Sequence, residues 1–522
     1  MKKNKQFIFA NIFPVFFKIK NQLALFSLCA YIGKIETHKF KIKIEDITIN
    51  PFFLLKNGIK VPFKNVYINF YHFKIEAEKC LNLPIQNSIL VTDDVIDSRI
   101  VYNLIYFKKS KNITRLLTTI GDNSIYFRQS VKNTLKLTVR KKNITDSKTK
   151  RVKIFVAYIM SKIFFVKNKI LLYEKENQKY EESASVVYEN LIDKGKDNVY
   201  FILDKNSSYW KYIDDKYKKN IIYSHSFKHY FYFFRTKTFM SSESLQHSMD
   251  LRVYSKYVNQ FLSRKKFKYV FLQHGVMYMV SLNSSSRSFF QKGNEMPLDS
   301  KVVVSSKKEA DHFIEYANYN MNDLYITGLP KFDRSIKHDS ADKITIMPTW
   351  RPWEYNLIRN EYKKAPIYKM VKKIINSIPE EYSDKIQFLP HPLIKNEMLN
   401  SDLSKYIPDI ESYDQILKNT ELLITDYSSI SYDAFYRGSN VIFYWEEKDK
   451  CLKNYDGDLM LKESETFGPI CYNKEQLSEI IHKIYGKKQE HKYKNRFKKI
   501  VEFDDNNNTE RLISMLEEDD YI

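Results

Sequence analysis

Asp426, Ser428 and Ser429 follow a run of apolar residues in the stretch ELLITDYSSISYDAFYRG, residues 421–438. The apolar run predicts a buried strand, and the spacing after it predicts a helix that begins within SISYDAFYRG. Backbone amides in the first turn of a helix lack partners and favour an anion, and serine hydroxyls add further donors. We therefore interpret Thr425, Asp426, Ser428 and Ser429 as a phosphate cradle, the alternative being that Asp426 or Ser428 is only an N-cap.

Asp433 lies farther along the same predicted helix. Its carboxylate either binds the ligand or forms an ion pair, and the sequence leaves both open.

His274 and Gly275 end another predicted strand, YVFLQHGV. Glycine allows a sharp turn, which would leave the imidazole free to accept a proton from a hydroxyl nucleophile. The alternative is a packed histidine. Gly328 ends the strand in LYITGLPKFD, where it permits the close approach of a ligand or of the opposing domain, or simply makes a turn.

Thr349 and Arg351 follow the strand in IMPTWRPW, and His391 lies between prolines in FLPHP. An arginine here suits bidentate phosphate binding, with a surface ion pair as the alternative. The prolines would hold His391 rigidly. Proteins with open parallel sheets bind their ligands beyond the carboxyl ends of the strands. Together these strand ends predict a crevice for a nucleotide diphosphate.

The elements that position these residues are short apolar runs that alternate with helical segments from about residue 168 onward. This pattern predicts a parallel sheet with crossover helices, and it occurs twice. We expect two facing, doubly wound domains at 151–335 and 336–522, with the polar segment 331–343 as the linker. Residues 36–150 alternate apolar and polar residues, which predicts a β-rich domain. The segment KRVKIFVAYIMSKIFF predicts a helix that connects the two regions.

Two apolar runs, residues 7–17 and 23–33, occupy the basic N-terminal region. Each is shorter than the roughly 20 residues that cross a bilayer. We interpret residues 1–35 as a segment that docks on an anionic membrane surface. A buried segment of the β-rich domain is the alternative.

The formal charge of +23 predicts an anionic partner, although lysine-rich composition alone also produces it. The basic residues are dispersed and no nucleic-acid-binding motif occurs, so nucleic acid is not expected. The four cysteines are far apart, which argues against a zinc site or disulfide framework and favours a reducing, cytosolic environment.

The blocks QHG, TGLPKFD, PTWR, LPHP and ITDYSSISYD, in this order, resemble the CDP-glycerol glycerophosphotransferase family, which includes teichoic acid polymerases and primases. The resemblance covers about residues 170–515 and implies a GT-B architecture, α/β, preceded here by the β-rich domain. It implies that His274, with Gly275, activates the acceptor hydroxyl and that Asp426 organises the donor loop. The implied ligands of the donor pyrophosphate include Arg351, His391, Thr425, Ser428 and Ser429.

The resemblance implies transfer of glycerol phosphate from CDP-glycerol, or of a related polyol phosphate from its CDP-polyol, to a hydroxyl of a lipid-linked anionic polymer, with release of CMP. The polymer would be teichoic-acid-like or capsular, and the enzyme peripheral at the cytoplasmic face of the membrane. Family members often continue the histidine block as H-G-T-P-x-K, whereas this chain reads HGVMYM from His274. This departure leaves the acceptor and the polyol open. No D-x-D motif follows a first-domain strand, so no metal or other cofactor is expected.

Two other functions compete with this hypothesis. The first is a GT-B glycosyltransferase, or a relative of the nucleotide-sugar 2-epimerases, that uses a UDP-sugar. The second is a non-catalytic protein that binds polyanions.

Overall fold

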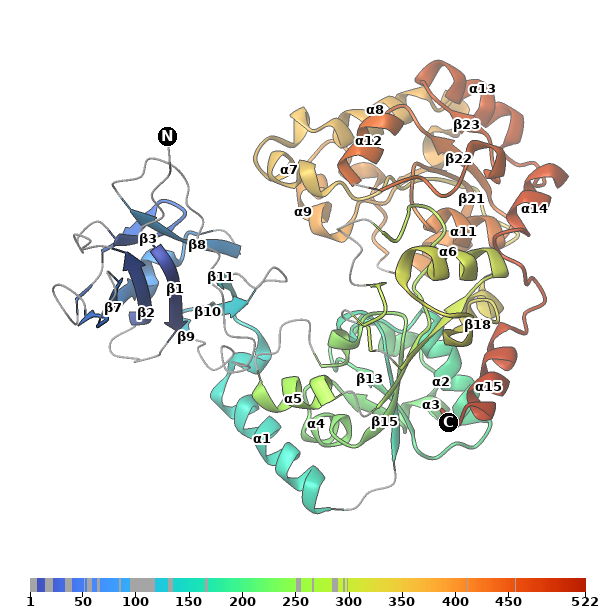
Figure 1. Ribbon diagram of the computed structural model, residues 1–522. Coiled ribbons are helices and arrows are strands. Elements are labelled where there is room, and N and C mark those ends of the chain that lie inside the picture. The colour runs from blue at the N-terminus through green and yellow to red at the C-terminus, as the bar shows by residue number, and fades with distance from the viewer. Residues whose placement is uncertain are drawn as a thin grey trace. The chain divides into compact units, whose positions relative to one another are not determined.

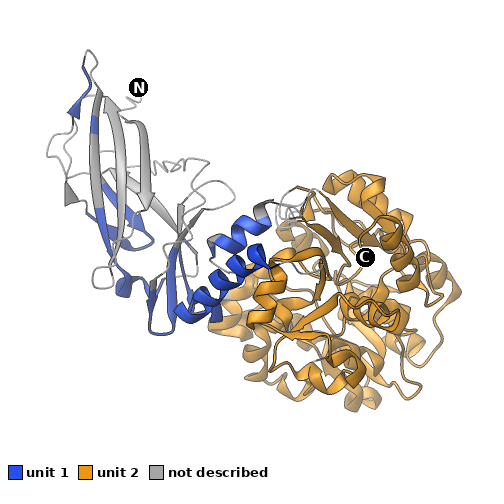
Figure 2. Cartoon of the chain, turned by 90° about the horizontal axis from the view of Figure 1, so that it is seen from below, with its two compact units in different colours: residues 1–164, 252–264 blue, residues 165–251, 265–522 orange. Residues whose placement is uncertain are grey.

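The fold is given by a computed structural model. The chain forms two compact units, residues 1–164 with 252–264 and residues 165–251 with 265–522 (Figure 2). The residues that the structure describes are 7–14, 22–32, 40–50, 52–53, 59–62, 66–83, 86–93, 118–129, 135–164, 168–249, 255–264, 267–283, 290–293, 296–297, 299–410, 412–455 and 457–522.

The first unit contains two antiparallel sheets, which confirms the β-rich N-terminal region. One sheet has the order β1-β2-β7-β5, with β6 also paired to β7, and the other has the order β4-β3-β8-β11-β10-β9. The strands are β1 (Phe7–Pro14), β2 (Gln22–Ile32), β3 (Phe40–Ile44), β4 (Ile47–Ile49), β5 (Phe52–Phe53), β6 (Ile59–Lys60), β7 (Val66–Glu76), β8 (Gln86–Asp93), β9 (Thr118–Ile120), β10 (Asn123–Gln129) and β11 (Leu135–Lys141).

Strands β1 and β2 lie within residues 1–35, which the sequence analysis interpreted as a separate membrane-docking segment. Strand β2 pairs along its whole length with β7, from Gln22 opposite Glu76 to Ile32 opposite Val66. Residues 7–14 and 22–32 therefore form strands in a sheet of the β-rich region. The boundary at residue 35 is corrected because backbone pairing with distant strands, rather than local composition, decides which sheet a strand joins. Residues 1–6, 15–21 and 33–35 of that segment lie outside the described residues.

Helix α1 (Lys148–Ile163) forms where the sequence predicted a connecting helix. Ser147 caps it by accepting a hydrogen bond from the amide of Lys150 at 3.2 Å. The helix belongs to the first unit with α5 (Lys256–Arg264), and the rings of Tyr158 and Tyr257 pack at 4.9 Å. The expected domain start at 151 therefore falls inside α1.

The second unit begins with a seven-stranded parallel sheet of order β14-β13-β12-β15-β16-β17-β18. Its strands are β12 (Lys169–Tyr173), β13 (Val199–Leu203), β14 (Ile221–Tyr223), β15 (Thr236–Ser241), β16 (Lys268–Phe271), β17 (Ser300–Val304) and β18 (Leu324–Ile326). Helices of this part are α2 (Ser183–Asp193), α3 (Asp215–Lys218), α4 (Phe227–Phe233) and α6 (Lys307–Ala317). The strand order reverses between β12 and β15, which is the switch point where doubly wound sheets bind ligands.

A five-stranded parallel sheet follows, of order β20-β19-β21-β22-β23. Its strands are β19 (Lys343–Ile346), β20 (Ile386–Phe388), β21 (Thr420–Thr425), β22 (Asn440–Tyr444) and β23 (Ile470–Cys471). Its helices are α7 (Tyr355–Glu361), α8 (Pro366–Ser377), α9 (Lys395–Leu399), α10 (Tyr413–Lys418), α11 (Ile430–Tyr436), α12 (Lys448–Tyr455) and α13 (Lys474–Ile484). The switch point lies between β19 and β21. Two doubly wound sheets in one unit confirm the expected GT-B class.

The C-terminal helices α14 (His491–Phe497) and α15 (Asn508–Glu518) return the chain to the first sheet (Figure 1). Helix α15 packs against α2, and Thr238 of β15 donates a hydrogen bond to the carbonyl of Tyr521 at 2.8 Å. The expected boundary that assigned residues 336–522 to the second half is therefore corrected for α15. Its buried face, including Leu512 and Leu516, belongs to a core shared with the first sheet.

Among the described residues, no helix has both the length and the apolar character that crossing a membrane would require.

Candidate active site

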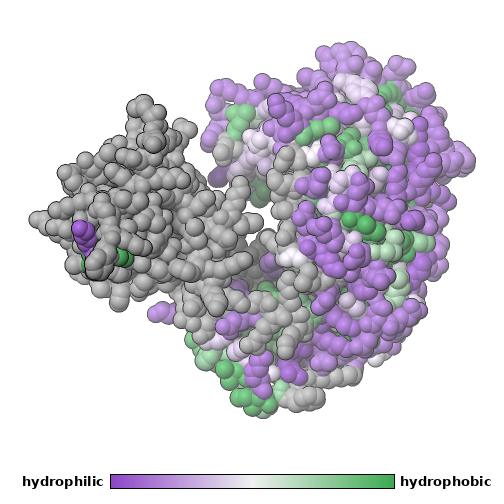
Figure 3. Space-filling view, viewed as in Figure 1, coloured by the Kyte–Doolittle hydropathy of each residue, from purple (hydrophilic) through white to green (hydrophobic). Residues whose placement is uncertain are grey.

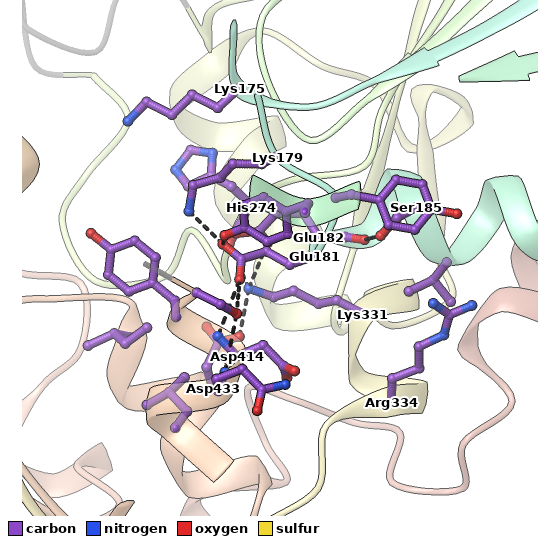
Figure 4. A pocket seen from close by; sticks show the side chains of 18 of the residues that line it. Lys175, Lys179, Glu181, Glu182, Ser185, His274, Lys331, Arg334, Asp414 and Asp433 are labelled. Atoms are coloured by element: carbon purple, nitrogen blue, oxygen red, sulfur yellow. Dashed lines mark hydrogen bonds and ion pairs between the residues drawn. The ribbon is translucent and has the colours of Figure 1, made fainter. Parts of the chain in front are cut away.

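A pocket of about 450 Å³ opens in the second unit beyond the carboxyl ends of both sheets (Figure 4). It is lined from both halves. The side chains used below are Lys175, Lys179, Glu181, Glu182, Glu189, Tyr209, Glu243, His274, Lys331, Arg334, Ser412, Asp414, Lys418, Ser428, Ser429, Asp433 and Arg437. Four of the residues proposed from the sequence thus line one pocket: His274, Ser428, Ser429 and Asp433.

His274 follows β16 by three residues and is exposed to the pocket. The preceding residue, Gln273, adopts a left-handed conformation with φ of 56°, and its buried side chain donates to the carbonyl of Val303 at 2.6 Å. Strained backbone of this kind persists where surrounding contacts determine it. His274 Nδ1 lies 3.3 Å from the carbonyl oxygen of Ser242, which can only accept, so Nδ1 is the donor. The neutral ring consequently carries its lone pair on Nε2.

Gly275 brings the histidine loop against α11 of the second half. A Cβ atom at this position would lie 3.0 Å from Ser429 Oγ and 3.9 Å from Asp433 Oδ2. The glycine therefore permits the close approach of two loops that follow different sheets. Ser429 is the N-cap residue of α11 but makes no side-chain capping bond, so its hydroxyl is not used to cap the start of the helix.

Lys331 is the buried cation at the base of the pocket. Its ammonium lies 2.6 Å from Asp433 Oδ1 and 3.5 Å from Glu182 Oε2, and it donates to the carbonyl oxygen of His274 at 2.6 Å. The ammonium thus pairs with two carboxylates and donates a hydrogen bond to one backbone carbonyl. Burial alone would lower the pKa of Lys331, but Asp433 and Glu182 outweigh this and raise it above its usual value. Asp433 forms the ion pair that the sequence left as one of two alternatives.

Asp426 organises the loop after β21. Its Oδ1 accepts from the amide of Thr349 at 2.7 Å, from the hydroxyl of Thr349 at 2.5 Å and from the amide of Tyr427 at 2.7 Å. The carboxylate is 2% exposed, so it acts through the backbone that it holds. Asp426 and Thr349 therefore join the ends of β21 and β19 and do not line the pocket.

Arg351 is 1% exposed and lies in the interior beside Asp426. It pairs with Glu447, with Glu354 at 3.3 Å and with Asp426 Oδ2 at 3.6 Å. Burial by itself would lower the pKa of the guanidinium, but the carboxylates of Asp426 and Glu447 outweigh burial and raise the pKa above its usual value. The group therefore stays charged. The structure thus shows the ion-pair alternative, in a buried rather than a surface position, because three carboxylates surround the side chain.

Thr425 and Ser428 differ in their surroundings. The hydroxyl of Thr425 is buried and donates to the carbonyl oxygen of Met347 at 2.6 Å, which ties β21 to the end of β19. Ser428 lines the pocket and is partly exposed. Within the expected cradle, the two serines face the cavity while Thr425 and Asp426 support them.

His391 begins the short helical turn Pro392–Ile394, and its Nδ1 accepts from the amide of Leu393 at 3.3 Å. Its ring stacks on Trp350 at 4.9 Å and 20°. Burial, followed by the positive charge of Lys175, lowers the pKa of His391 to about 4. The imidazole is therefore neutral near pH 7. Part of the lowering of its pKa comes from Lys175, which lines the pocket.

Gly328 is explained by packing rather than by a ligand. Its φ is +78°, and a Cβ there would lie 2.0 Å from Asn508 Oδ1. Asn508 in turn donates to Asp333 Oδ1 at 2.8 Å. The TGLPKFD block thus meets the C-terminal NNNTERL block, and the expected role of Gly328 at the ligand is corrected, since Asn508 fills that space.

Glu181 makes a second contact between the two halves. Its Oε1 accepts from Lys179 and from the Tyr209 hydroxyl, each at 2.6 Å. Its Oε2 accepts from the Ser412 hydroxyl at 2.6 Å. The pocket wall is consequently bridged at two places, by Glu181 and by Lys331.

The sequence interpretation did not select Lys175, Glu181, Glu182 or Lys331 as site residues. Lys331 was visible as a lysine between Pro330 and Phe332, both of which are buried, but it was assigned to a polar linker. Its side chain is 9% exposed. The apolar residues on both sides of Lys331 were the sequence signal that could have indicated a buried lysine.

Among the described residues, no group of three or more histidine, cysteine, aspartate or glutamate side chains is arranged to hold a metal ion. Most of the cations that line the pocket form ion pairs with carboxylates.

Comparison with known proteins gives a consistent result. The sequence model of the CDP-glycerol:poly(glycerophosphate) glycerophosphotransferase family matches residues 155–518. The minor teichoic acid biosynthesis protein GgaB of Bacillus subtilis is 26% identical over 395 residues, which cover 70% of this chain and 41% of that protein. The teichoic acid glycerol-phosphate primase of Bacillus subtilis is 23% identical over 235 residues, covering 41% of this chain and 57% of the primase. The chain thus spans about half the length of these relatives.

Among solved structures, the wall teichoic acid polymerase TagF, in a form soaked with CDPG, superimposes with a TM-score of 0.52 and 14% identity. The match covers 71% of this chain and 93% of that one. At this identity the likeness concerns the fold.

Proposed function

The chain belongs to the CDP-glycerol:poly(glycerophosphate) glycerophosphotransferase family, and from this premise we propose that it transfers glycerol phosphate, or a related polyol phosphate, from a CDP-activated donor to a hydroxyl of a teichoic-acid-like or capsule polymer. The acceptor is a lipid-linked anionic polymer, and CMP is the second product. The observation that carries the proposal is the placement of His274 in the pocket with Nδ1 donating to Ser242. That hydrogen bond leaves Nε2 ready to accept a proton.

The proposed reaction is a displacement at the phosphorus that bears the polyol. The acceptor oxygen attacks this phosphorus while Nε2 of His274 takes the hydroxyl proton. The bond between that phosphorus and the bridging oxygen breaks, and CMP leaves with the bond electrons. A phosphodiester forms between polyol and acceptor, and no oxidant or reductant is needed. Such a transfer depends mainly on positioning and on charge stabilisation.

The donor side of the proposal rests on the loop between β21 and α11. Ser428 and Ser429 line the pocket, and Gly275 holds the histidine loop within contact of Ser429. These hydroxyls supply donors to phosphate oxygens. Asp426 orients the loop through the amide of Tyr427, which makes it a positioning residue.

The test is CMP release from CDP-glycerol, with CDP-ribitol and UDP-N-acetylglucosamine in parallel and a lipid-linked glycerol phosphate as acceptor. General base catalysis contributes about 10²- to 10⁴-fold, so His274→Ala should lower turnover by that factor. His482→Ala, at an exposed histidine of α13, is the matched control and should retain activity. Release of UDP alone would favour the UDP-sugar enzyme, and tight polymer binding without turnover would favour the polyanion-binding protein.

Peripheral attachment to an anionic membrane at the cytoplasmic face is part of the proposal. Helix α1 carries four lysines and Arg151 but no acidic residue. Figure 3 has an apolar patch at lower left, where Figure 1 draws α1. Exposed apolar side chains of α1 recur at helical spacing at Val152, Val156, Ile159 and Ile163, and Phe155 is exposed as well. An apolar stripe with basic neighbours suits the surface of an anionic bilayer.

This attachment is measured by sedimentation of the full chain with phosphatidylglycerol vesicles. The double variant Val152→Ser/Ile163→Ser should remain in the supernatant, whereas Ile336→Ser, which alters an exposed isoleucine outside α1, should sediment like the wild type. Point variants are preferable to deletion of residues 1–35, because that deletion removes β2 from its sheet. Equal sedimentation of the α1 variant and the wild type would remove this part of the proposal.

A further inference from the structure

Six lysine and arginine side chains line the pocket, and five of them are neutralised by carboxylates. Their pairs are Lys179 with Glu181 at 2.6 Å, Lys331 with Asp433 at 2.6 Å, Arg334 with Glu189, Lys418 with Asp414 at 2.8 Å and Arg437 with Asp414 at 2.8 Å. The remaining cation is Lys175. Within the part of the chain that the structure describes, its ammonium makes no ion pair or side-chain hydrogen bond, and no dashed line reaches it in Figure 4.

Lys175 stands at the switch point of the first sheet. It follows the end of β12 by two residues, beside β15, whose end leads to Glu243 of the pocket lining. Ligands of doubly wound sheets bind in the crevice at this point. An uncompensated positive charge here faces the space that a ligand would enter.

The loop that carries Lys175 is strained and firmly held. Glu176 and Asn177 both have positive φ, 52° and 58°, although neither is glycine. The amide of Glu176 donates to His247 Nδ1 at 3.0 Å, and the carbonyl of Asn177 accepts from the amide of Asp204 at 2.6 Å. Such strained conformations persist where neighbouring contacts enforce them, often at functional sites. The turn at Glu176 and Asn177 therefore fixes the backbone directly after Lys175.

The second half contributes His391 to the same electrostatic environment. After burial, Lys175 is the charge that lowers the pKa of His391. A carboxylate close to His391 would act in the opposite direction, and none is among the causes of the shift. The positive charge of Lys175 therefore reaches across to the other half of the unit.

We propose that Lys175 is a phosphate-binding residue, whose ammonium receives an anionic phosphate of the substrate at the mouth of the pocket, on the side of His391. The inference rests on the proposed function, because that reaction brings phosphate groups to His274. The phosphate comes either from the CDP-activated donor or from the anionic acceptor. The shared chemistry is an oxyanion that pairs with a lysine held by the first sheet.

The first experiment does not depend on turnover. Binding of pyrophosphate to the full-length protein is measured by titration calorimetry for the wild type, Lys175→Met, Lys175→Arg and Lys205→Met. Lys205 is an exposed lysine in the turn after β13 and serves as the matched control. A charged hydrogen bond is worth roughly tenfold in affinity, so Lys175→Met should bind about tenfold more weakly, with Lys175→Arg and Lys205→Met close to the wild type.

Equal pyrophosphate affinity in the wild type and Lys175→Met would overturn the proposal, and so would an absence of pyrophosphate binding in the wild type. If the affinity falls as expected while no CDP-polyol is turned over by the wild type, the proposed function fails and the anion site stands.

The second experiment identifies the source of the phosphate. CMP release is measured while CDP-glycerol and the acceptor are varied separately, with one acceptor that ends in glycerol phosphate and one that ends in a sugar hydroxyl. A raised KM for CDP-glycerol with both acceptors in Lys175→Met assigns the donor phosphate. A raised KM confined to the glycerol phosphate acceptor assigns the acceptor phosphate. Unchanged KM values for all three would overturn a role in substrate binding.

Discussion

Lys331 Nζ lies 2.6 Å from Asp433 Oδ1, and this buried pair joins the two halves of the second unit beneath the pocket. Lys331 belongs to the short helical turn after β18, whereas Asp433 lies on α11 after β21. The same ammonium donates to the backbone of His274. One side chain thus holds the histidine loop and the serine loop in a common position.

Removing one partner of this pair should destabilise the protein strongly. The side chains are 9% and 7% exposed, and Asp433→Asn leaves a buried ammonium with less compensation, at a cost of about 3–5 kcal/mol in the free energy of unfolding. Urea unfolding measures this. The control is Lys372→Met, whose ion pair with Asp402 is exposed and should contribute less than about 1 kcal/mol. Equal effects of the two variants would show that the Lys331–Asp433 pair has no special weight.

Gly275→Ala should impair donor binding more than it affects stability. The added Cβ would lie 3.0 Å from Ser429 Oγ, a side-chain atom that can rotate away. The hydroxyl would then leave its place at the pocket, and we expect the KM for CDP-glycerol to rise about tenfold. In a Ser429→Ala background the same glycine substitution should add little, because the displaced hydroxyl is already absent. Additive losses in the double variant would contradict this explanation.

Gly328→Ala should destabilise the fold more than Gly438→Ala. Both glycines have positive φ, 78° and 97°, so alanine is strained at each by roughly 1–2 kcal/mol. Only Gly328 is crowded, since its Cβ would lie 2.0 Å from Asn508 Oδ1, while Gly438 has nothing within 4 Å. The difference in the free energy of unfolding therefore isolates the contact between the TGLPKFD turn and α15. A larger loss for Gly438→Ala would refute this interpretation.

His391 should remain neutral down to a pH well below that of an ordinary histidine. Burial and Lys175 lower its folded-state pKa to about 4, from 6.5. Between these values the unfolded chain binds a proton that the folded chain does not, so this contribution to stability is complete above pH 6.5 and is lost as the pH falls toward 4. Wild-type stability relative to His391→Gln should decline over that range.

A direct measurement of the same group is the NMR titration of the His391 ring. Lys175→Met should move its pKa upward toward 6.5, and Lys205→Met should leave it unchanged. A titration midpoint near 6.5 in the wild type would show that the ring is not shielded as the structure indicates.

The strands and the crevice were largely predictable from local sequence. Apolar runs such as those ending at Asp426 and His274 marked strand ends, and the period-2 alternation marked the β-rich region. Helix α2 agrees with the expected alternation of strands and helices after residue 168. Strand β17, Ser300–Val304, was missed although its run of valines is apolar. Helices and strands can be predicted in this way because the periodicity of apolar side chains depends only on residues that are close in sequence.

The sequence by itself thus determined the class of fold, the two sets of strand ends and the presence of His274, Ser428 and Ser429 at a crevice. Only the tertiary structure decided which charges are free. The sequence left phosphate binding and an ion pair open for Arg351, and the structure pairs it with Glu447, 96 residues away. Lys175, by contrast, makes no ion pair within the described part of the chain. Lys331 and Asp433 likewise find each other only when the two sheets meet. The physical reason is that an ion pair depends on distance in space, and sequence periodicity specifies only which residues share a face of one element.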